Sequence, residues 1–267
     1  FFAPNVSPSS RATLGGMINT DACGKGSRIY GRTSNHILEL NCVLSNGESM
    51  CSVLINQDSV EEYKQMTGIQ GEIYRTVDEV VRSRKKLIHD TFPRLSRFMT
   101  GYNLAGVLNA DESTLNLNAL LSGSEGTLAF VSEARLRLTR IPRERLLLVV
   151  HYGSFDDALR DASRLVESDP AAIETLDEKI LTLAKKDEIY PRVQKWVEDP
   201  EGRPTRTINL IEFSGDEITE LEKKIHPICE EILKKRDTPG EAHGFFITDK
   251  AREISELWNL RKKGVGL

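Results

Sequence analysis

The sequence lacks the features that mark several protein classes. No run of apolar residues is long enough to cross a membrane. No basic stripe is present either, because 36 Lys and Arg are interspersed with 40 Asp and Glu, for a net charge of -4. Nucleic-acid binding requires concentrated positive charge, so we expect neither a membrane span nor a nucleic-acid partner.

Cysteines are few, and they are not spaced for metal binding. Cys23, Cys42, Cys51 and Cys229 form no CxxC or Cys/His pattern. We therefore expect no metal site and no iron–sulfur site within this stretch. Small buried thiols are typical of a reducing cytoplasm, which is the location we expect.

Neither end of the chain has the pattern of a natural terminus. The chain begins Phe1-Phe2-Ala3-Pro4, with no initiator Met and no signal peptide, and it stops at Leu267 directly after a helical pattern. We expect an internal fragment of a longer polypeptide.

The first half of the chain predicts a long loop followed by a β-hairpin. Residues 1–35 are rich in Ser, Gly, Asn and Thr, and irregular backbone of that length usually holds a ligand. Two alternating apolar runs between Ile37 and Ile55 flank Asn46-Gly47, which is a strong hairpin signal. The further expectations are helices from Ser59 to about Phe92, a polar loop over 101–118 and a strand over 134–138.

Beyond Pro142 the pattern alternates strands with helices. Strands are expected over 146–152, 173–176, 207–213 and 243–248, and the longer helices after Ser154, over 217–235 and over 250–263. This order predicts an α+β sandwich with helices on one face of a mainly antiparallel sheet. We place a domain boundary at Pro142, so that residues 1–142, with a helical insertion at about 56–118, form one domain and residues 143–267 the other.

Two glycine-containing segments are the candidate ligand site. The first glycine segment, residues 13–24, includes Thr13-Leu14-Gly15-Gly16, and the second glycine segment, residues 123–130, begins Gly123-Ser124-Glu125-Gly126. Glycines let backbone N–H groups approach a ligand, and exposed amides with short hydroxyls suit an anion such as pyrophosphate. Taken alone the signal is weak, since a Gly-Gly pair is more often a turn and no GxGxxG or P-loop pattern is present.

Taken in this order and at this spacing, the two segments resemble flavin-contacting loops of the FAD-linked oxidase family typified by vanillyl-alcohol oxidase. The resemblance implies an α+β fold: the second half of a vanillyl-alcohol-oxidase-type FAD-binding domain, followed by an α+β cap domain with a mainly antiparallel sheet. Within the family, the chain is most similar to the large bacterial D-2-hydroxyglutarate dehydrogenases, which combine FAD with an iron–sulfur region. The segments carrying this finer likeness are Ile18–Asp21, the insertion, Phe98–Leu104 and Trp258–Lys263.

The resemblance implies that both glycine segments contact FAD. The cofactor-binding residues that it implies are Thr13, Gly15, Gly16, Thr20, Asp21, Ala22, Gly24, Glu125, Gly126, Ala129 and Phe130. Asp21 stands where many relatives carry Asn, Cys23 where many carry Gly, and Ala129 where Gly is usual. From the residues alone, Glu125 before a glycine turn is more simply a capping or amide-accepting group.

Arg261 is the candidate substrate-binding residue. An arginine beside Lys262 and Lys263 near a helix C-terminus is most often solvated, whereas the resemblance implies that it binds the substrate carboxylate, a task that suits the planar guanidinium. The implied enzyme is an FAD-dependent dehydrogenase that oxidises a D-2-hydroxy acid, foremost D-2-hydroxyglutarate, by hydride transfer to flavin. A D-lactate or glycolate dehydrogenase of the same family is one alternative, and a non-catalytic scaffold that retains the fold is an alternative of another class.

Several parts of such an enzyme are expected outside this stretch. None of the five histidines lies in a His-x-Gly-Asp-Gly-like context, so we expect the catalytic base downstream of Leu267. The iron–sulfur cluster and the divalent metal are likewise expected in the missing regions. Because the upstream part of the FAD site is also missing, we expect this stretch alone to be colourless and inactive. The electron acceptor and the oligomeric state stay open.

Overall fold

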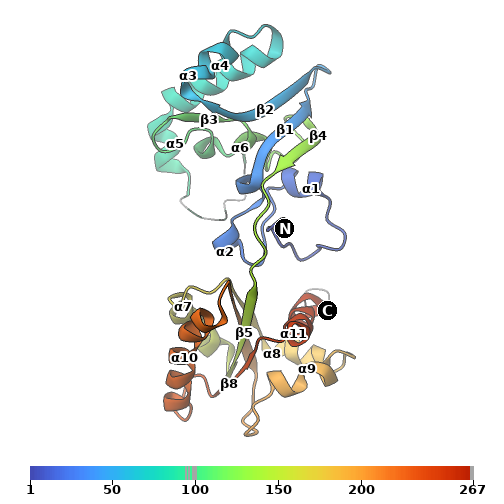
Figure 1. The fold of residues 1–267 in the computed structure, drawn as a ribbon, viewed down its shortest axis with the longest axis vertical. Helices are drawn as coiled ribbons and strands as arrows, with labels where there is room; N and C mark the ends of the chain where they lie inside the picture. Colours follow the sequence, from blue (N-terminus) through green and yellow to red (C-terminus); the bar gives the residue numbers. More distant parts are fainter. Residues whose placement is uncertain (94, 96, 98–100, 265–267) are drawn as a thin grey trace. The chain divides into compact units, whose positions relative to one another are not determined.

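The computed structural model describes residues 1–264 except 94, 96 and 98–100. Of the segments compared with the D-2-hydroxyglutarate dehydrogenases, Phe98, Met99 and Thr100 therefore lie outside the described residues. The chain divides into an N-terminal unit, Phe1–Arg140, and a C-terminal unit, Ile141–Leu267 (Figure 1). Among the described residues, no helix combines the length and the apolar character needed to cross a membrane.

The N-terminal unit contains an antiparallel sheet in the order β3-β2-β1-β4. Its strands are β1 (Ile37–Val43), β2 (Ser49–Asn56), β3 (Thr114–Asn116) and β4 (Phe130–Leu136). The predicted hairpin is confirmed, and Gly47 takes the left-handed conformation of its turn with φ 86°. The strand expected over 134–138 begins earlier, because β4 pairs with β1 from Phe130 onward.

Helices and short turns complete this unit. Its longer helices are α3 (Gln57–Lys64), α4 (Gly68–Ser83) and α5 (Lys85–Thr91), and its shorter ones are α1 (Leu14–Asn19), α2 (Ser27–Tyr30), α6 (Asn118–Leu121), η1 (Thr33–His36) and η2 (Leu104–Gly106). The helical prediction for 59–92 is confirmed, with one break over residues 65–67, just before Gly68 (φ 73°), and another at Arg84. The expectation of a polar loop over 101–118 was wrong in one respect, because β3 lies inside this range and pairs with β2.

The C-terminal unit contains a wholly antiparallel sheet in the order β6-β7-β5-β8. Its strands are β5 (Glu144–Tyr152), β6 (Ala172–Leu176), β7 (Thr207–Gly215) and β8 (Gly244–Thr248). Its helices are α7 (Phe155–Val166), α8 (Glu178–Ala184), α9 (Tyr190–Val197), α10 (Ile218–Lys235) and α11 (Ala251–Gly264). The predicted antiparallel α+β order is confirmed.

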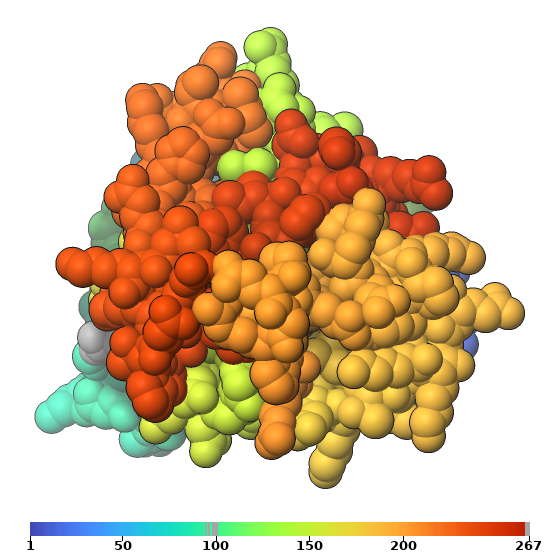
Figure 2. Space-filling model, turned by 90° about the horizontal axis from the view of Figure 1, so that it is seen from below, coloured from blue at the N-terminus to red at the C-terminus, as the bar shows by residue number. Residues whose placement is uncertain are grey.

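The expectation of helices on one face of this sheet was wrong. Leu147 and Val149 point to one face and pack with residues of α8, α9 and α11, whereas Leu146 and Leu148 point to the other face and pack with α7 and α10. A strand that is apolar at successive positions is buried on both faces, because its side chains alternate. In Figure 2 the gold surface of α8 and α9 lies beside the red surface of α11.

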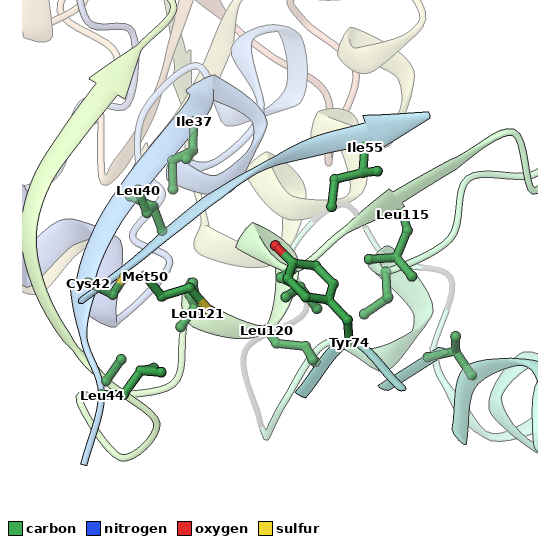
Figure 3. Packing of buried hydrophobic residues seen from close by; sticks show 14 of the residues in the cluster. Ile37, Leu40, Cys42, Leu44, Met50, Ile55, Tyr74, Leu115, Leu120 and Leu121 are labelled. Atoms are coloured by element: carbon green, nitrogen blue, oxygen red, sulfur yellow. The ribbon is translucent and has the colours of Figure 1, made fainter. Parts of the chain in front are cut away.

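The core of the N-terminal unit lies between its sheet and its helices. Leu40 of β1 and Leu115 of β3 are fully buried, and Tyr74 of α4 is 1% exposed (Figure 3). Leu120 and Leu121 of α6 belong to the same cluster. Because α6 leads directly into the second glycine segment, this core fixes where that segment begins.

Candidate functional site

The first glycine segment folds around the short helix α1. Thr13 caps the helix, since its Oγ1 accepts a hydrogen bond from Gly16 N at 3.1 Å. At the other end, Thr20 Oγ1 donates to Gly16 O at 2.9 Å. Around Gly15, a Cβ would meet no atom within 4 Å. The hydroxyls therefore stabilise the helix itself, while the backbone at Gly15 stays open to a ligand.

Asp21 turns its side chain into the N-terminal unit. Its carboxylate accepts hydrogen bonds from Ser34 N at 2.8 Å and Ser34 Oγ at 3.0 Å, and it pairs with Arg32 Nε at 3.0 Å. The residue is 6% exposed and has φ 45°, in the left-handed region that Asp and Asn tolerate better than most residues. Asp21 is thus a structural anchor of this segment.

The end of the first glycine segment packs tightly on the chain near Asn5. A Cβ at Gly24 would lie 2.0 Å from Asn5 O, so only glycine fits there without movement. Ala22 O accepts from both Thr33 N at 3.0 Å and Thr33 Oγ1 at 2.7 Å. Cys23, between them, is half-buried and has a free thiol.

The second glycine segment is hydrogen-bonded directly to the first. Gly123 N donates to Ile18 O at 3.0 Å, and Glu125 N donates to Asn19 O at 2.8 Å. Residues 123, 125 and 126 all have positive φ, of 78°, 53° and 76°, which makes the tight turn. Two segments about a hundred residues apart are therefore brought together, with the Glu125 side chain exposed.

Both glycine segments carry open backbone and exposed apolar side chains. Leu14 is 51% exposed, Leu128 38% and Phe130 71%, whereas Ala129 is buried at 7%. At Gly126, as at Gly15, a Cβ would meet nothing within 4 Å. Asn19 Oδ1 is buried and lacks a hydrogen-bond partner among the described residues. Exposed apolar side chains, open glycine backbone and an orphaned acceptor fit a flat heteroaromatic ligand with N–H groups, such as a flavin.

Three of these residues were missed by the sequence-based assignment. Asn19, Leu14 and Leu128 lie inside the two glycine segments, but the resemblance implied no role for them. The available signal was the presence of leucines in otherwise polar loops, since exposed apolar residues that cluster mark binding surfaces.

The stretch between β2 and β3 contacts both glycine segments. Arg97 donates through Nη2 to Gly24 O at 3.0 Å and through Nε to Ser27 Oγ at 2.8 Å. The Tyr102 hydroxyl lies 2.8 Å from Thr127 Oγ1, which in turn donates to Ser124 O at 2.6 Å. Arg97 and Tyr102, which follow α5 in the chain, therefore connect this stretch to the two glycine segments.

Arg261 lies in the last turns of α11, in the C-terminal unit. Its Nε and Nη2 donate to Glu174 Oε2 on β6 at 3.1 Å and 3.0 Å. The two side chains are 26% and 23% exposed. The guanidinium is accordingly half-buried and engaged with a carboxylate, unlike a freely solvated helix-end arginine.

Two histidines of the C-terminal unit, His151 and His243, have hydrogen-bond partners within that unit. His151 is fully buried on β5 and hydrogen-bonds Trp196 O through Nε2 at 2.9 Å; burial lowers its pKa to about 4. His243 Nδ1 lies 3.1 Å from Asp199 Oδ2, just before β8. Both occupy the strand or strand-end positions expected for them. Within the described part of the chain, no three His, Cys, Asp or Glu side chains are arranged to hold a metal ion.

Comparison with known protein families gives a match to the C-terminal unit and a match to the first part of the N-terminal unit. Residues 141–267 match the family described as FAD linked oxidases, C-terminal domain, and residues 1–50 match an FAD binding domain. The first match covers the whole C-terminal unit from its first residue. The second match covers the first glycine segment and most of the β1–β2 hairpin.

Relatives with assigned functions match the chain over its whole length. It is 44% identical to the D-2-hydroxyglutarate dehydrogenase of Pseudomonas putida and 39% identical to that of Escherichia coli. The glycolate oxidase subunit GlcD of Bacillus subtilis is 26% identical over 98% of the chain. The chain spans about a quarter, 26%, of each of the two dehydrogenases and 44% of the Bacillus subunit.

Solved structures with the same fold include alkyldihydroxyacetonephosphate synthase. Two crystal forms of it superpose with TM-scores of 0.58 and 0.52, over 98% and 94% of the chain, and 38% and 36% of theirs. Because only 14% of the residues are identical, this likeness concerns the fold alone.

Proposed function

Because the chain belongs to the FAD-linked oxidase family, we propose that it is part of an FAD-dependent dehydrogenase that oxidises a D-2-hydroxy acid to the 2-oxo acid. The proposed substrate is D-2-hydroxyglutarate, since four relatives with that activity are 39–44% identical over the chain. A D-lactate or glycolate substrate is the alternative, favoured by relatives that are 22–26% identical.

The convergence of the two glycine segments carries the proposal. Glu125 N bonded to Asn19 O places the turn 123–126 directly against the end of α1. A scaffold without a cofactor would have no use for two open glycine backbones beside exposed leucines and a phenylalanine. A flavin explains the open backbone, the apolar surface and the orphaned Asn19 acceptor together.

Residues of the two glycine segments would make different kinds of contact with the cofactor. Gly15 and Gly126 present backbone with space in front of it, so they would approach the ring system closely. Gly16, which faces the Thr13 hydroxyl that caps α1, would contribute through its backbone. Phe130 and the leucines would cover apolar ring surface, and Glu125 would contribute an exposed carboxylate. The Thr20 hydroxyl, which donates to Gly16 O, would still accept a hydrogen bond from the cofactor. Asp21, Ala22 and Gly24 would contribute through their backbone, since the Asp21 side chain is committed to Ser34 and Arg32. When bound, flavin supplies the hydride acceptor, and the protein supplies binding and orientation.

Arg261 would bind the substrate carboxylate. A guanidinium fixes a carboxylate through parallel charge-assisted hydrogen bonds, and orientation of the substrate C–H bond is the main catalytic contribution of such a group. Arg261 already donates two hydrogen bonds to a carboxylate, that of Glu174, so its geometry suits this type of partner.

The remaining components are proposed to lie elsewhere in the polypeptide. These are the catalytic base, any divalent metal, the iron–sulfur cluster and the contact to the electron acceptor. A cytoplasmic location is proposed in keeping with the four free thiols.

The test uses Gly15→Leu in the full-length protein. Because a Cβ at Gly15 meets no atom within 4 Å, leucine is compatible with the fold, and it favours helix more than glycine does. We expect flavin affinity to fall at least about tenfold, equivalent to about 1.4 kcal/mol, while the melting temperature of the flavin-free protein stays unchanged.

The matched control is Gly153→Leu in the C-terminal unit, where a Cβ likewise has space. It should retain bound flavin, measured by the visible absorption band and by equilibrium dialysis. Full flavin content and full 2-hydroxy-acid oxidation in Gly15→Leu would overturn the proposed site.

A further inference from the structure

Two carboxylates lie on the sheet face that α11 covers. Glu174 of β6 pairs across the ladder with Leu210, and Glu212 of β7 pairs with Ala172. Because side chains alternate along a strand, residues 210 and 212 point to the same face, and their cross-strand partners point there too. Leu210 packs in one cluster with Leu257 of α11, so both carboxylates face this helix.

Helix α11 supplies one donor to each carboxylate. Trp258 Nε1 donates to Glu212 Oε2 at 2.6 Å, in a buried contact. Three residues later, Arg261 donates to Glu174 Oε2 through both Nε and Nη2. Residues three apart lie on one side of a helix, so the two contacts together fix α11 against the sheet. The contact with Glu174 also fixes the orientation of the Arg261 guanidinium.

We propose that Glu174 is the positioning residue for Arg261. It holds the guanidinium in one orientation before the substrate arrives, so that little side-chain freedom remains to be lost when the substrate carboxylate binds. Arginine is among the side chains with the most rotamer freedom, and prior ordering improves affinity by reducing that loss. This inference rests on the proposed role of Arg261 in substrate binding.

A positioning role predicts a change in KM without a matching change in kcat. Without Glu174, ordering the Arg261 side chain would cost free energy when the substrate binds. This cost is the same for the bound ground state and for the transition state, so it weakens binding of both equally and raises KM. For Glu174→Ala we expect KM for the 2-hydroxy acid to rise about three- to tenfold, with kcat within about twofold. Glu174→Gln keeps a carbonyl oxygen that accepts from Nε and Nη2, so it should restore most of the wild-type KM.

The experiment measures steady-state kinetics of the full-length enzyme in four variants: Glu174→Ala, Glu174→Gln, Arg261→Ala and a control, Glu220→Ala. Glu220 forms an exposed pair with Lys223 on α10, which packs on the opposite face of the sheet. The control should leave KM unchanged, and flavin content is recorded for every variant to confirm an intact cofactor site.

The outcomes separate this inference from the proposed function. If Arg261→Ala leaves kinetics unchanged, the role of Arg261 fails, and the inference falls with it. If Arg261→Ala raises KM while Glu174→Ala does not, only the inference is overturned. A lower KM in Glu174→Ala, which would make Glu174 a competitor of the substrate, overturns it as well. So does an equal loss of kcat in both Glu174 variants, since a purely structural role would produce that result.

Discussion

Acidification is expected to destabilise the C-terminal unit through His151. The ring is fully buried, Nε2 donates to Trp196 O, and Nδ1 has no hydrogen-bond partner among the described residues. Burial is the main cause that lowers its pKa to about 4, and the neighbouring His243 acts in the same direction, against the Trp196 carbonyl and Asp199. An unfolded chain has a histidine pKa of about 6.5, so the unfolded state takes up the proton first.

The sign and size of the effect follow from proton linkage. A basic group whose pKa is lower in the folded state than in the unfolded state stabilises the fold at pH values above its unfolded pKa. That stabilisation is lost as the pH falls from about 6.5 toward about 4. Between about pH 7 and about pH 5, the expected loss in free energy of unfolding is about 2 kcal/mol. Asp199 and Glu198, whose pKa values are lowered, add losses of the same sign at more acidic pH, so the range above about pH 5.5 reports mainly the histidine.

Urea unfolding followed by tryptophan fluorescence measures this effect. The chain has two tryptophans, Trp196 and Trp258, both in the C-terminal unit, so the signal reports that unit alone. In His151→Gln, which keeps an N–H donor for Trp196 O, stability should be lower at neutral pH but nearly flat down to about pH 5.5. His226→Gln, an exposed position on α10, is the control and should keep the wild-type slope. An identical pH slope in wild type and His151→Gln would refute the reasoning.

Two further predictions concern packing and thiol chemistry. In Gly24→Ala the new Cβ would lie 2.0 Å from Asn5 O, so we expect a loss of about 2 kcal/mol in stability; unchanged thermal unfolding would contradict the tight contact. Burial raises the pKa of Cys42 to about 11 and that of Cys229 to about 12, so iodoacetamide near neutral pH should leave both unmodified in the folded chain and should modify them in urea. Peptide mass spectrometry checks this, and rapid alkylation of Cys229 without denaturant would count against the assigned burial.

Local patterns in the sequence were sufficient for most elements of the fold. Asn46-Gly47 between two alternating runs predicted the β1–β2 hairpin, because turn geometry and side-chain alternation are encoded within a few residues. The apolar run of β5 and the periodicity of α10 were recognisable for the same reason. The three-residue strand β3 was missed because a strand that short has no measurable alternation and exists only through its pairing with β2.

The covering of the second sheet was a matter of tertiary structure. Leu146–Val150 is apolar at every position, which is compatible with burial on one face or on two. Only the packing of α7 and α10 on one side, and of α8, α9 and α11 on the other, decides between these.

The candidate site divides in the same way. By itself the sequence determined which residues were available: open glycines, short hydroxyls and a Trp-x-x-Arg helix, in an order that resembles one family. Tertiary structure alone decided that Glu125 meets Asn19, that the Asp21 carboxylate turns inward to Arg32, and that Arg261 is held by Glu174. These contacts join residues from 11 to about a hundred positions apart and depend on how the whole chain packs. Composition and local periodicity therefore cannot predict them.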